Sequence, residues 1–333
     1  MNSVPNLDQI TEAAVKLSPH IVNTPVVRLQ GRTTDAFIDG CASLHMKLEL
    51  FQRTGTFKAR GALLTAMSLP PERRKLGVTA ASAGNHAIAV AYAASVVGAS
   101  AKILVQASAN PLRIAATRAY GAEVILAPDG AAAFSGAEAL VRDEGRYMIH
   151  PFEGPLISLG TATVGLELMQ QLPDTEAVVV AVGGGGLASG MATAIKLLRP
   201  RTLVFGVEPV GANAMEQSFA AGGVQRLATV QTIADSLAPP MTLPYSYGLC
   251  RRFVDKIVTV SDDEIRKAMA LLFYDAKLAV EPAGAAALAA TIGPLRSELR
   301  GLRVAVIVCG ANVDRDSFFG NLSRGEDLLS GYR

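Results

Sequence analysis

The sequence has no tryptophan, and phenylalanine and tyrosine bring the aromatic content to only 5% of the 333 residues. Its three cysteines, Cys41, Cys250 and Cys309, are too few and too scattered for a disulfide framework. Charged residues make up 18% of the chain, the formal net charge is +2, and no long run of lysine and arginine occurs. The scarcity of thiols indicates a reducing, cytoplasmic compartment, and the weak charge argues against nucleic acid as a partner.

Long apolar runs are also missing. The most membrane-like stretch, 87–101, has fifteen residues, whereas a transmembrane helix needs ~20. Residues 1–8 lack the basic and apolar regions of a signal peptide. We therefore expect no membrane partner.

Apolar and small residues are abundant instead. Half of the residues are hydrophobic and 31 are glycine, which excludes a disordered chain, and the length suggests about two domains. β-rich segments alternate with Ala/Leu-rich segments of helical spacing, so we predict an α/β fold with largely parallel sheets. The expected strands are 44–48, 78–81, 101–105, 123–126, 177–182, 203–207, 257–260 and 303–308, and the expected helices include 57–67, 87–97, 187–198 and 262–272.

The first segment with chemical potential is 54–62, Thr-Gly-Thr-Phe-Lys-Ala-Arg-Gly-Ala. Thr56 is the expected N-cap of a helix that carries Lys58 in its first turn. An amine near the positive end of a helix and among apolar neighbours loses its proton easily, and a neutral amine forms a Schiff base with a carbonyl. Taken alone, the segment fits an ordinary solvated lysine better.

A second segment, 82–86 (Ser-Ala-Gly-Asn-His), lies between a predicted strand and a long helix. A hydroxyl, flexible backbone and an amide at a helix N-terminus can bind an anion such as a carboxylate. The alternatives are an ordinary turn capped by Ser82 or Asn85 and a core position for His86.

The third segment, 182–187 (Val-Gly-Gly-Gly-Gly-Leu), follows a buried strand. Four glycines allow several backbone N–H groups to face one phosphate. The segment also fits the dinucleotide pattern G-x-G-x-x-A through Ala188, with Glu208 about 20 residues further on. A nicotinamide-dependent oxidoreductase is therefore a rival hypothesis.

A fourth segment, 308–314 (Val-Cys-Gly-Ala-Asn-Val-Asp), lies at the carboxyl end of the last predicted strand, where ligands of α/β sheets gather. The Cys309 thiol can hydrogen-bond weakly to a neutral ring nitrogen without supplying a full charge. The alternative is a buried structural cysteine.

Together with Glu-Pro-Ala-Gly-Ala at 281–285, these segments occur in an order that resembles the fold-type II pyridoxal-phosphate enzymes, of which tryptophan synthase β is an example. Within that group the chain is similar to the serine/threonine dehydratase and serine racemase branch. The resemblance runs from about Thr24 to about Asp316, nearly the whole chain. The nicotinamide hypothesis explains only one of the five segments.

The resemblance implies two open, twisted, parallel-sheet domains: a large one of residues 1–75 and 150–333, and a small mobile one of residues 76–149. It implies pyridoxal 5′-phosphate as cofactor, bound covalently by the catalytic Lys58. The implied cofactor-binding residues are Phe57, Lys58, Asn85, Gly183, Gly184, Gly185, Gly186, Leu187, Glu281 and Cys309. The implied substrate-binding residues are Ser82, Ala83, Gly84, Asn85 and His86. A homodimer is compatible with the resemblance.

The implied reaction removes water from a β-hydroxy amino acid such as L-threonine or L-serine and gives a 2-keto acid and ammonia. Racemases of this branch have a second serine where this chain has Ala83, so we expect elimination without appreciable racemisation. Glu208 and Ala212 match two ligands of metal-dependent members, but Ala214 lacks the third ligand's oxygen, so we predict no divalent metal. A monovalent cation or a weaker site stays open.

The substrate stays open in the sequence. Residues 239–247 (Pro-Pro-Met-Thr-Leu-Pro-Tyr-Ser-Tyr) depart from the pattern expected of threonine dehydratases. The segment either shapes a pocket for a larger β-substituent, as in 3-phenylserine, or is surface structure. A catalytically inactive relative is a third hypothesis, against which the intact lysine, glycine and amide positions argue.

Overall fold

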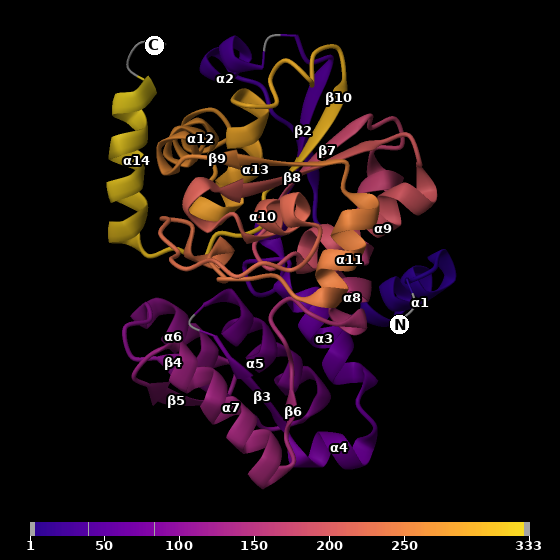
Figure 1. The fold of residues 1–333 in the computed structure, drawn as a ribbon, viewed down its shortest axis with the longest axis vertical. Helices are drawn as coiled ribbons and strands as arrows, with labels where there is room; N and C mark the ends of the chain where they lie inside the picture. The colour runs from indigo at the N-terminus through magenta and orange to yellow at the C-terminus, as the bar shows by residue number, and fades with distance from the viewer. Residues whose placement is uncertain (1–3, 39, 83, 330–333) are drawn as a thin grey trace.

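Two sheets built from distant parts of the chain organise the fold (Figure 1). The computed structural model describes residues 4–38, 40–82 and 84–329. In Figure 1 the larger sheet lies in the upper part of the molecule and the smaller one in the lower part, with α3 and α8 where the two meet.

The larger sheet has six strands in the order β1-β2-β10-β7-β8-β9. These strands are β1 (Val26–Arg28), β2 (Ser43–Lys47), β7 (Ala177–Ala181), β8 (Leu203–Pro209), β9 (Lys256–Val260) and β10 (Arg303–Ile307). Only the β1–β2 pair is antiparallel, and β10 lies between β2 and β7, with Val304 opposite Leu44 and Ala177. The last strand in sequence thereby joins the two halves of the sheet.

The smaller sheet is entirely parallel, in the order β5-β4-β3-β6. Its strands are β3 (Val78–Ala81), β4 (Ala101–Gln106), β5 (Glu123–Ala127) and β6 (Tyr147–Met148). All four belong to one continuous stretch, 78–148, enclosed in sequence by segments of the larger sheet.

Helices cover both sheets. They are α1 (Leu7–Leu17), α2 (Arg32–Phe37), α3 (Lys58–Ser68), α4 (Pro71–Leu76), α5 (Asn85–Val97), α6 (Pro111–Ala119), α7 (Gly130–Glu144), α8 (Pro155–Gln171), α9 (Gly186–Leu198), α10 (Ala214–Ala221), α11 (Pro244–Phe253), α12 (Asp262–Tyr274), α13 (Pro282–Ile292) and α14 (Arg315–Leu329), with short 3₁₀ turns η1 (Glu49–Phe51), η2 (Val210–Ala212) and η3 (Asp235–Leu237). Among the described residues, no helix combines the length and the apolar character that a membrane crossing requires.

The prediction of an α/β fold with two parallel-sheet units is confirmed. All of β7 is buried, as are four of the five residues of β10, in keeping with strands covered on both faces. One detail was wrong: Phe57, not Thr56, is the residue at the N-cap of α3, and Phe57 already has helical dihedral angles (φ −56°, ψ −20°). The Thr56 hydroxyl accepts a hydrogen bond from the Lys58 N–H at 3.3 Å.

Helices α8 and α9 pack at close range because small residues line their contact. A Cβ atom on Gly190 would lie 2.2 Å from the Ser158 carbonyl oxygen, closer than any side chain tolerates. The Ser158 and Ser189 hydroxyls are 2.9 Å apart in the same contact. This packing fixes the start of α9, and with it the glycine segment that precedes the helix.

Candidate active site

A cavity of about 460 Å³ opens at the carboxyl ends of strands from both sheets, at or just after the last residues of β3, β4, β7 and β10. Open α/β sheets bind ligands at these ends. Every predicted site residue that the structure describes lines this cavity: Phe57, Lys58, Ser82, Gly84, Asn85, His86, Gly183, Gly184, Gly185, Gly186, Leu187, Glu281 and Cys309. Ala83 lies outside the described residues.

Lys58 is the first residue of α3. Its Nζ atom donates a hydrogen bond to the Pro151 carbonyl oxygen at 2.9 Å and lies 5.1 Å from the centre of the Phe57 ring. Burial lowers the pKa of the Lys58 amine to about 8, while the neighbouring Cys309 and Glu281 act in the opposite direction. A substantial fraction of this amine is therefore neutral near physiological pH.

The glycine segment 183–186 connects β7 to α9. No backbone N–H from Gly183 to Ala188 donates a hydrogen bond to another described residue. Gly185 has φ +97°, and a Cβ atom on Gly184 would lie within 2.4 Å of the Phe152 ring. Free N–H groups at the start of a helix, with no side chain in the way, form a binding site for a phosphate.

Asn85, the first residue of α5, connects the two sheets beside the cavity. Its amide nitrogen donates to Glu281 Oε1 at 2.7 Å and to the Ser236 hydroxyl at 3.1 Å, and its oxygen accepts from the Asn312 amide at 2.9 Å. Glu281 Oε2 is buried without a hydrogen-bond partner among the described residues. Burial raises the pKa of Glu281 to about 7, so its carboxyl group readily holds a proton.

Two histidines beside Lys58 are neutral. His86 Nε2 lies 2.7 Å from the Ile149 carbonyl oxygen, and burial with the nearby Lys58 lowers the pKa of His86 to about 3. His150, which the sequence did not single out, accepts backbone N–H bonds at Nδ1 from Phe152 and Glu153. Burial lowers the pKa of His150 to about 4. His86 thus combines a satisfied buried position with a place in the cavity wall.

The segments that follow β3 and β10 contribute Ser82, Gly84 and Cys309 to the cavity wall. The Ser82 hydroxyl accepts a hydrogen bond from the Gly84 N–H at 3.2 Å, and Gly84 is the N-cap residue of α5. The Cys309 thiol donates to the Ala283 carbonyl oxygen at 3.4 Å. Burial raises the pKa of this thiol strongly, so it stays protonated and uncharged.

Other cavity residues carry no local sequence signal. Arg113 on α6 forms an ion pair with Asp235, lies 3.6 Å from Glu281, and donates from Nε to the Asn312 carbonyl oxygen at 2.9 Å. Phe134 on α7 lines the cavity with 38% of its surface exposed. Neither side chain belongs to a recognisable motif, and only the fold brings them here.

The segment 239–247 lies partly in the cavity wall and partly in helix α11. Pro239 and Pro240 line the cavity, whereas Pro244 opens helix α11. Glu153 accepts the backbone N–H groups of Tyr245 and Ser246 at 2.7 and 3.0 Å, which holds the start of α11 beside the cavity wall. The segment is therefore not only surface structure.

Glu208, which matches a ligand of metal-dependent relatives in the sequence, binds backbone N–H groups in the structure. Its two carboxylate oxygens accept the N–H groups of Met215 and Glu216 at 2.8 and 2.7 Å, at the start of α10. Burial raises the pKa of Glu208 to about 8 despite these bonds. In the part of the chain that the structure describes, no three His, Cys, Asp or Glu side chains are grouped as metal ligands.

One cavity contains an amine with a lowered pKa, a turn of free N–H groups that suits a phosphate, and a buried carboxyl oxygen that accepts no hydrogen bond from the described residues. These features fit a cofactor that carries both an aldehyde and a phosphate. Residues 17–310 match the family described as pyridoxal-phosphate dependent enzyme. The chain belongs to this family, and its cofactor is pyridoxal 5′-phosphate. The nicotinamide hypothesis for the glycine segment is thereby set aside.

The relatives narrow the branch. The chain is 48% identical over 323 residues to phenylserine dehydratase of Ralstonia pickettii, which covers 97% of this chain and 98% of that protein. It is 40% identical over 274 residues to L-threonine ammonia-lyase of Thermotoga maritima. This match covers 81% of this chain and 67% of that protein. The structure of maize serine racemase matches with a TM-score of 0.90 at 32% identity, over 99% of this chain and 100% of that one. The fold is that of fold-type II enzymes.

Proposed function

We propose that this chain is a dehydratase, an ammonia-lyase, that eliminates water from a β-hydroxy amino acid. The released enamine then takes up water and gives a 2-keto acid and ammonia. The chain's preferred substrate carries an aromatic ring on the β-carbon, as in 3-phenylserine, and L-threonine and L-serine are poorer substrates. The observation that carries the proposal is the single cavity in which the Lys58 amine, the free N–H groups of the glycine segment and an apolar wall meet. Phenylserine dehydratase and L-threonine ammonia-lyase among the relatives support it.

In this proposal the glycine segment 183–186 and the start of α9 hold the cofactor phosphate, and Lys58 holds the cofactor covalently. Phe57, Glu281 and Cys309 surround its ring. When bound, the cofactor withdraws electrons from the substrate Cα and so weakens the bond to the Cα proton. Because the Cys309 thiol keeps its proton, it supplies no charge to the ring.

Lys58 acts as the general base. Its pKa of about 8 makes the neutral amine, the form that accepts the Cα proton, far more abundant near neutral pH than in an ordinary lysine. Ser82, Gly84, Asn85 and His86 form the wall that receives the substrate carboxylate at the start of α5. Ala83 belongs to the same segment in the sequence, and its methyl group has no proton to exchange, so the reaction ends in elimination and not in racemisation.

The apolar wall supports an aromatic substrate. Phe134 and Phe152 line the cavity with Pro239 and Pro240. The Phe134 and His150 ring centres are 6.2 Å apart, and those of His150 and Phe152 are 4.7 Å apart. This row of rings ends at Phe152, which follows Pro151 in the sequence. The Pro151 carbonyl oxygen accepts the hydrogen bond from Lys58 Nζ. Aromatic rings favour each other in edge-to-face contacts at these distances.

The proposal includes a mobile part, 76–149, that closes over a large part, 1–75 and 150–333. All strands of the smaller sheet lie within 78–148. Arg113 reaches from α6 to Asp235 at the rim of the cavity. Closure of this kind excludes water during the reaction.

Assembly and compartment belong to the proposal as well: a homodimer in the cytoplasm. The free thiols of Cys41, Cys250 and Cys309 suit a reducing compartment. Light scattering after size exclusion should find two chains of 34.7 kDa. A species with the mass of one chain would refute the dimer.

A substrate panel tests the activity. The purified protein with pyridoxal phosphate should form keto acid faster from 3-phenylserine than from L-threonine or L-serine. Borohydride reduction and peptide mapping should find the cofactor on Lys58, and Lys58→Ala should abolish both results. Phe134→Ala should lower kcat/KM for 3-phenylserine about 10-fold, since an aromatic contact contributes about 1 kcal/mol or more.

Phe319→Ala is the matched control, because this ring is exposed on α14 outside the cavity lining. Faster turnover of L-threonine than of 3-phenylserine would favour the second candidate, a threonine ammonia-lyase. Formation of D-serine from L-serine would contradict the role given to Ala83.

A further inference from the structure

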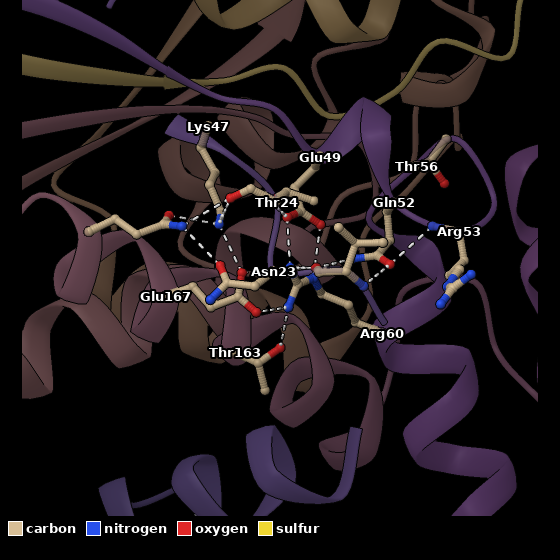
Figure 2. A network of polar contacts seen from close by, with 12 residues as sticks. Asn23, Thr24, Lys47, Glu49, Gln52, Arg53, Thr56, Arg60, Thr163 and Glu167 are labelled. Carbon is tan, nitrogen blue, oxygen red and sulfur yellow. Dashed lines mark hydrogen bonds and ion pairs between the residues drawn. The ribbon is translucent and has the colours of Figure 1, made fainter. Parts of the chain in front are cut away.

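Four charged side chains are buried together around Arg60, which follows Lys58 by two residues in α3: Lys47, Glu49, Arg60 and Glu167, here named the Arg60 cluster (Figure 2). The side chains of Lys47, Glu49 and Arg60 are 0% exposed, and that of Glu167 is 11% exposed. Arg60 binds both oxygens of Glu49 at 2.8 Å and both oxygens of Glu167 at 2.7 and 2.9 Å. One guanidinium group thus holds two carboxylates in fixed directions.

The cluster is neutral and hydrogen-bonded throughout. Lys47 donates to Glu167, Gln171 and the Thr24 carbonyl oxygen at 2.8, 2.9 and 2.8 Å. Arg60 also donates to the Thr163 hydroxyl at 3.1 Å. Although burial alone would raise it, the pKa of Glu167 is lowered by Arg60 and Lys47, so the carboxylate stays charged. Two cations and two anions balance.

Burial of such a cluster is a poor way to gain stability, because desolvation offsets most of the attraction, and well-packed apolar residues serve as well or better. A guanidinium group that binds carboxylates in bidentate fashion contributes fixed geometry, since each carboxylate must lie in the guanidinium plane and face two of its N–H groups. The position of the cluster in the fold shows what this geometry holds.

The cluster joins the elements that carry both halves of the cofactor site. Glu49 in η1 and Arg60 in α3 clamp the ends of the segment that contains Phe57 and Lys58. Glu167 belongs to α8, whose Thr161 hydroxyl donates to the Gly186 carbonyl oxygen at 2.7 Å. A continuous path of contacts therefore runs from the helix of Lys58, through Arg60 and Glu167, to the glycine segment.

We propose that the Arg60 cluster is a positioning device that fixes the separation between the Lys58 amine and the glycine segment 183–186, and that Arg60 is its central positioning residue. The inference rests on the proposed roles of these two groups in cofactor binding. A wrong separation would leave the cofactor phosphate bound but the amine displaced. A displacement of about 1 Å can lower a rate 10²-fold.

Arg60→Lys tests the device, because lysine keeps the charge but cannot bind two carboxylates in a plane. We expect the variant to bind pyridoxal phosphate, to lose about 10- to 100-fold in kcat, and to change KM less than about 3-fold. The apo variant should capture the cofactor more slowly in stopped-flow absorbance, and the bound cofactor should lose circular dichroism in its absorption band because its orientation is less fixed.

Arg146→Lys is the matched control. Arg146 is a buried arginine with 8% exposure that binds Glu144 and Ser100 beside the smaller sheet, outside the cavity lining. It should lower Tm while leaving kcat, the capture rate and the cofactor dichroism unchanged. Equal effects of both variants on these three readouts, or wild-type values for Arg60→Lys, would overturn the inference.

Glu49→Gln is a second variant for the case that Arg60→Lys does not fold. It keeps an acceptor for Arg60 but loosens one end of the clamp, so kcat and the capture rate should fall in the same direction by about 10-fold. Wild-type values in a folded Glu49→Gln protein would overturn the inference. Failure of the proposed function would look different, because the wild-type protein would then carry no cofactor on Lys58.

Discussion

The Lys58 amine lies in surroundings that disfavour its own charge. The pKa of about 8 is below the ordinary value of 10.5 because the side chain is buried in the cavity wall. Between pH 8 and pH 10.5 the unfolded chain therefore binds a proton that the folded apo chain has released. The contribution of Lys58 to the stability of the apo protein should rise as the pH rises through this window, and below pH 8 the full penalty from this amine remains.

Lys58→Met removes this penalty together with the base. We expect the apo variant to be more stable than the wild-type apo protein at pH 7, and this difference in stability to shrink between pH 8 and 10.5. Urea unfolding at pH 7, 8.5 and 10 measures both effects. Equal pH profiles for the two proteins would show that the amine keeps its ordinary pKa in the fold.

At the scale of elements, the turn between β7 and α9 determines whether a phosphate can bind. The N–H groups of residues 183–188 are free because they belong to the turn after β7 and to the first turn of α9. A methyl group on Gly184 would collide with the Phe152 ring. Gly184→Ala should weaken the binding of pyridoxal phosphate at least 10-fold, equivalent to about 1.4 kcal/mol. A fluorescence titration of the apo protein measures this affinity.

The control is Gly248→Ala in α11, where nothing lies within 4 Å of the added methyl group. This variant should bind the cofactor normally and gain about 0.4–1 kcal/mol of stability. Unchanged affinity in Gly184→Ala would mean that the phosphate does not use this turn.

The elements also differ in how far the sequence determines them. Long apolar strands such as β7 and β10 were predicted because complete burial leaves a continuous hydrophobic run. β1 and β6, with three and two residues, were not predicted, since so short a segment shows no periodicity. The antiparallel pairing of β1 is likewise set by its neighbour, not by its own residues.

The same limit applies to the cavity. The local segments could be singled out in the sequence, since each ends a strand or begins a helix, and those of their predicted residues that the structure describes line the cavity. Arg60 lies in the segment 54–62, but the sequence predicted no role for it, because its partner Glu167 is 107 residues away in the chain. Arg113 and Phe134 were missed for the same reason. Their neighbours in the sequence form no motif that would predict a position in the cavity wall.

At the scale of the whole molecule, side chains of α6 and its N-cap contact segments outside the stretch 78–148 that forms the smaller sheet. The Arg113–Asp235 pair and the Asn110–Asp314 hydrogen bond both join α6 or its cap to segments of the larger unit. The Asp235 side chain is 61% exposed, so salt should weaken its pair with Arg113.

Asp235→Asn should therefore raise the KM for the amino-acid substrate several-fold. It should also remove the rise of KM that we expect in the wild-type protein between 0.05 and 0.5 M NaCl. Asp143→Asn, which removes an exposed pair with Arg142 far from the cavity, is the control and should behave as wild type. An identical salt dependence in Asp235→Asn would show that this pair does not hold the cavity closed.

The position of β10 has a consequence for synthesis. A chain leaving the ribosome contains Lys58 and the glycine segment long before it contains the strand that separates β2 from β7. Until about residue 307 has emerged, those two strands expose unpaired edges, which are prone to wrong pairing. We therefore expect vitamin B6 to be captured only after β10 has emerged, and a nascent chain that stalls before that point holds the amine without the complete cavity.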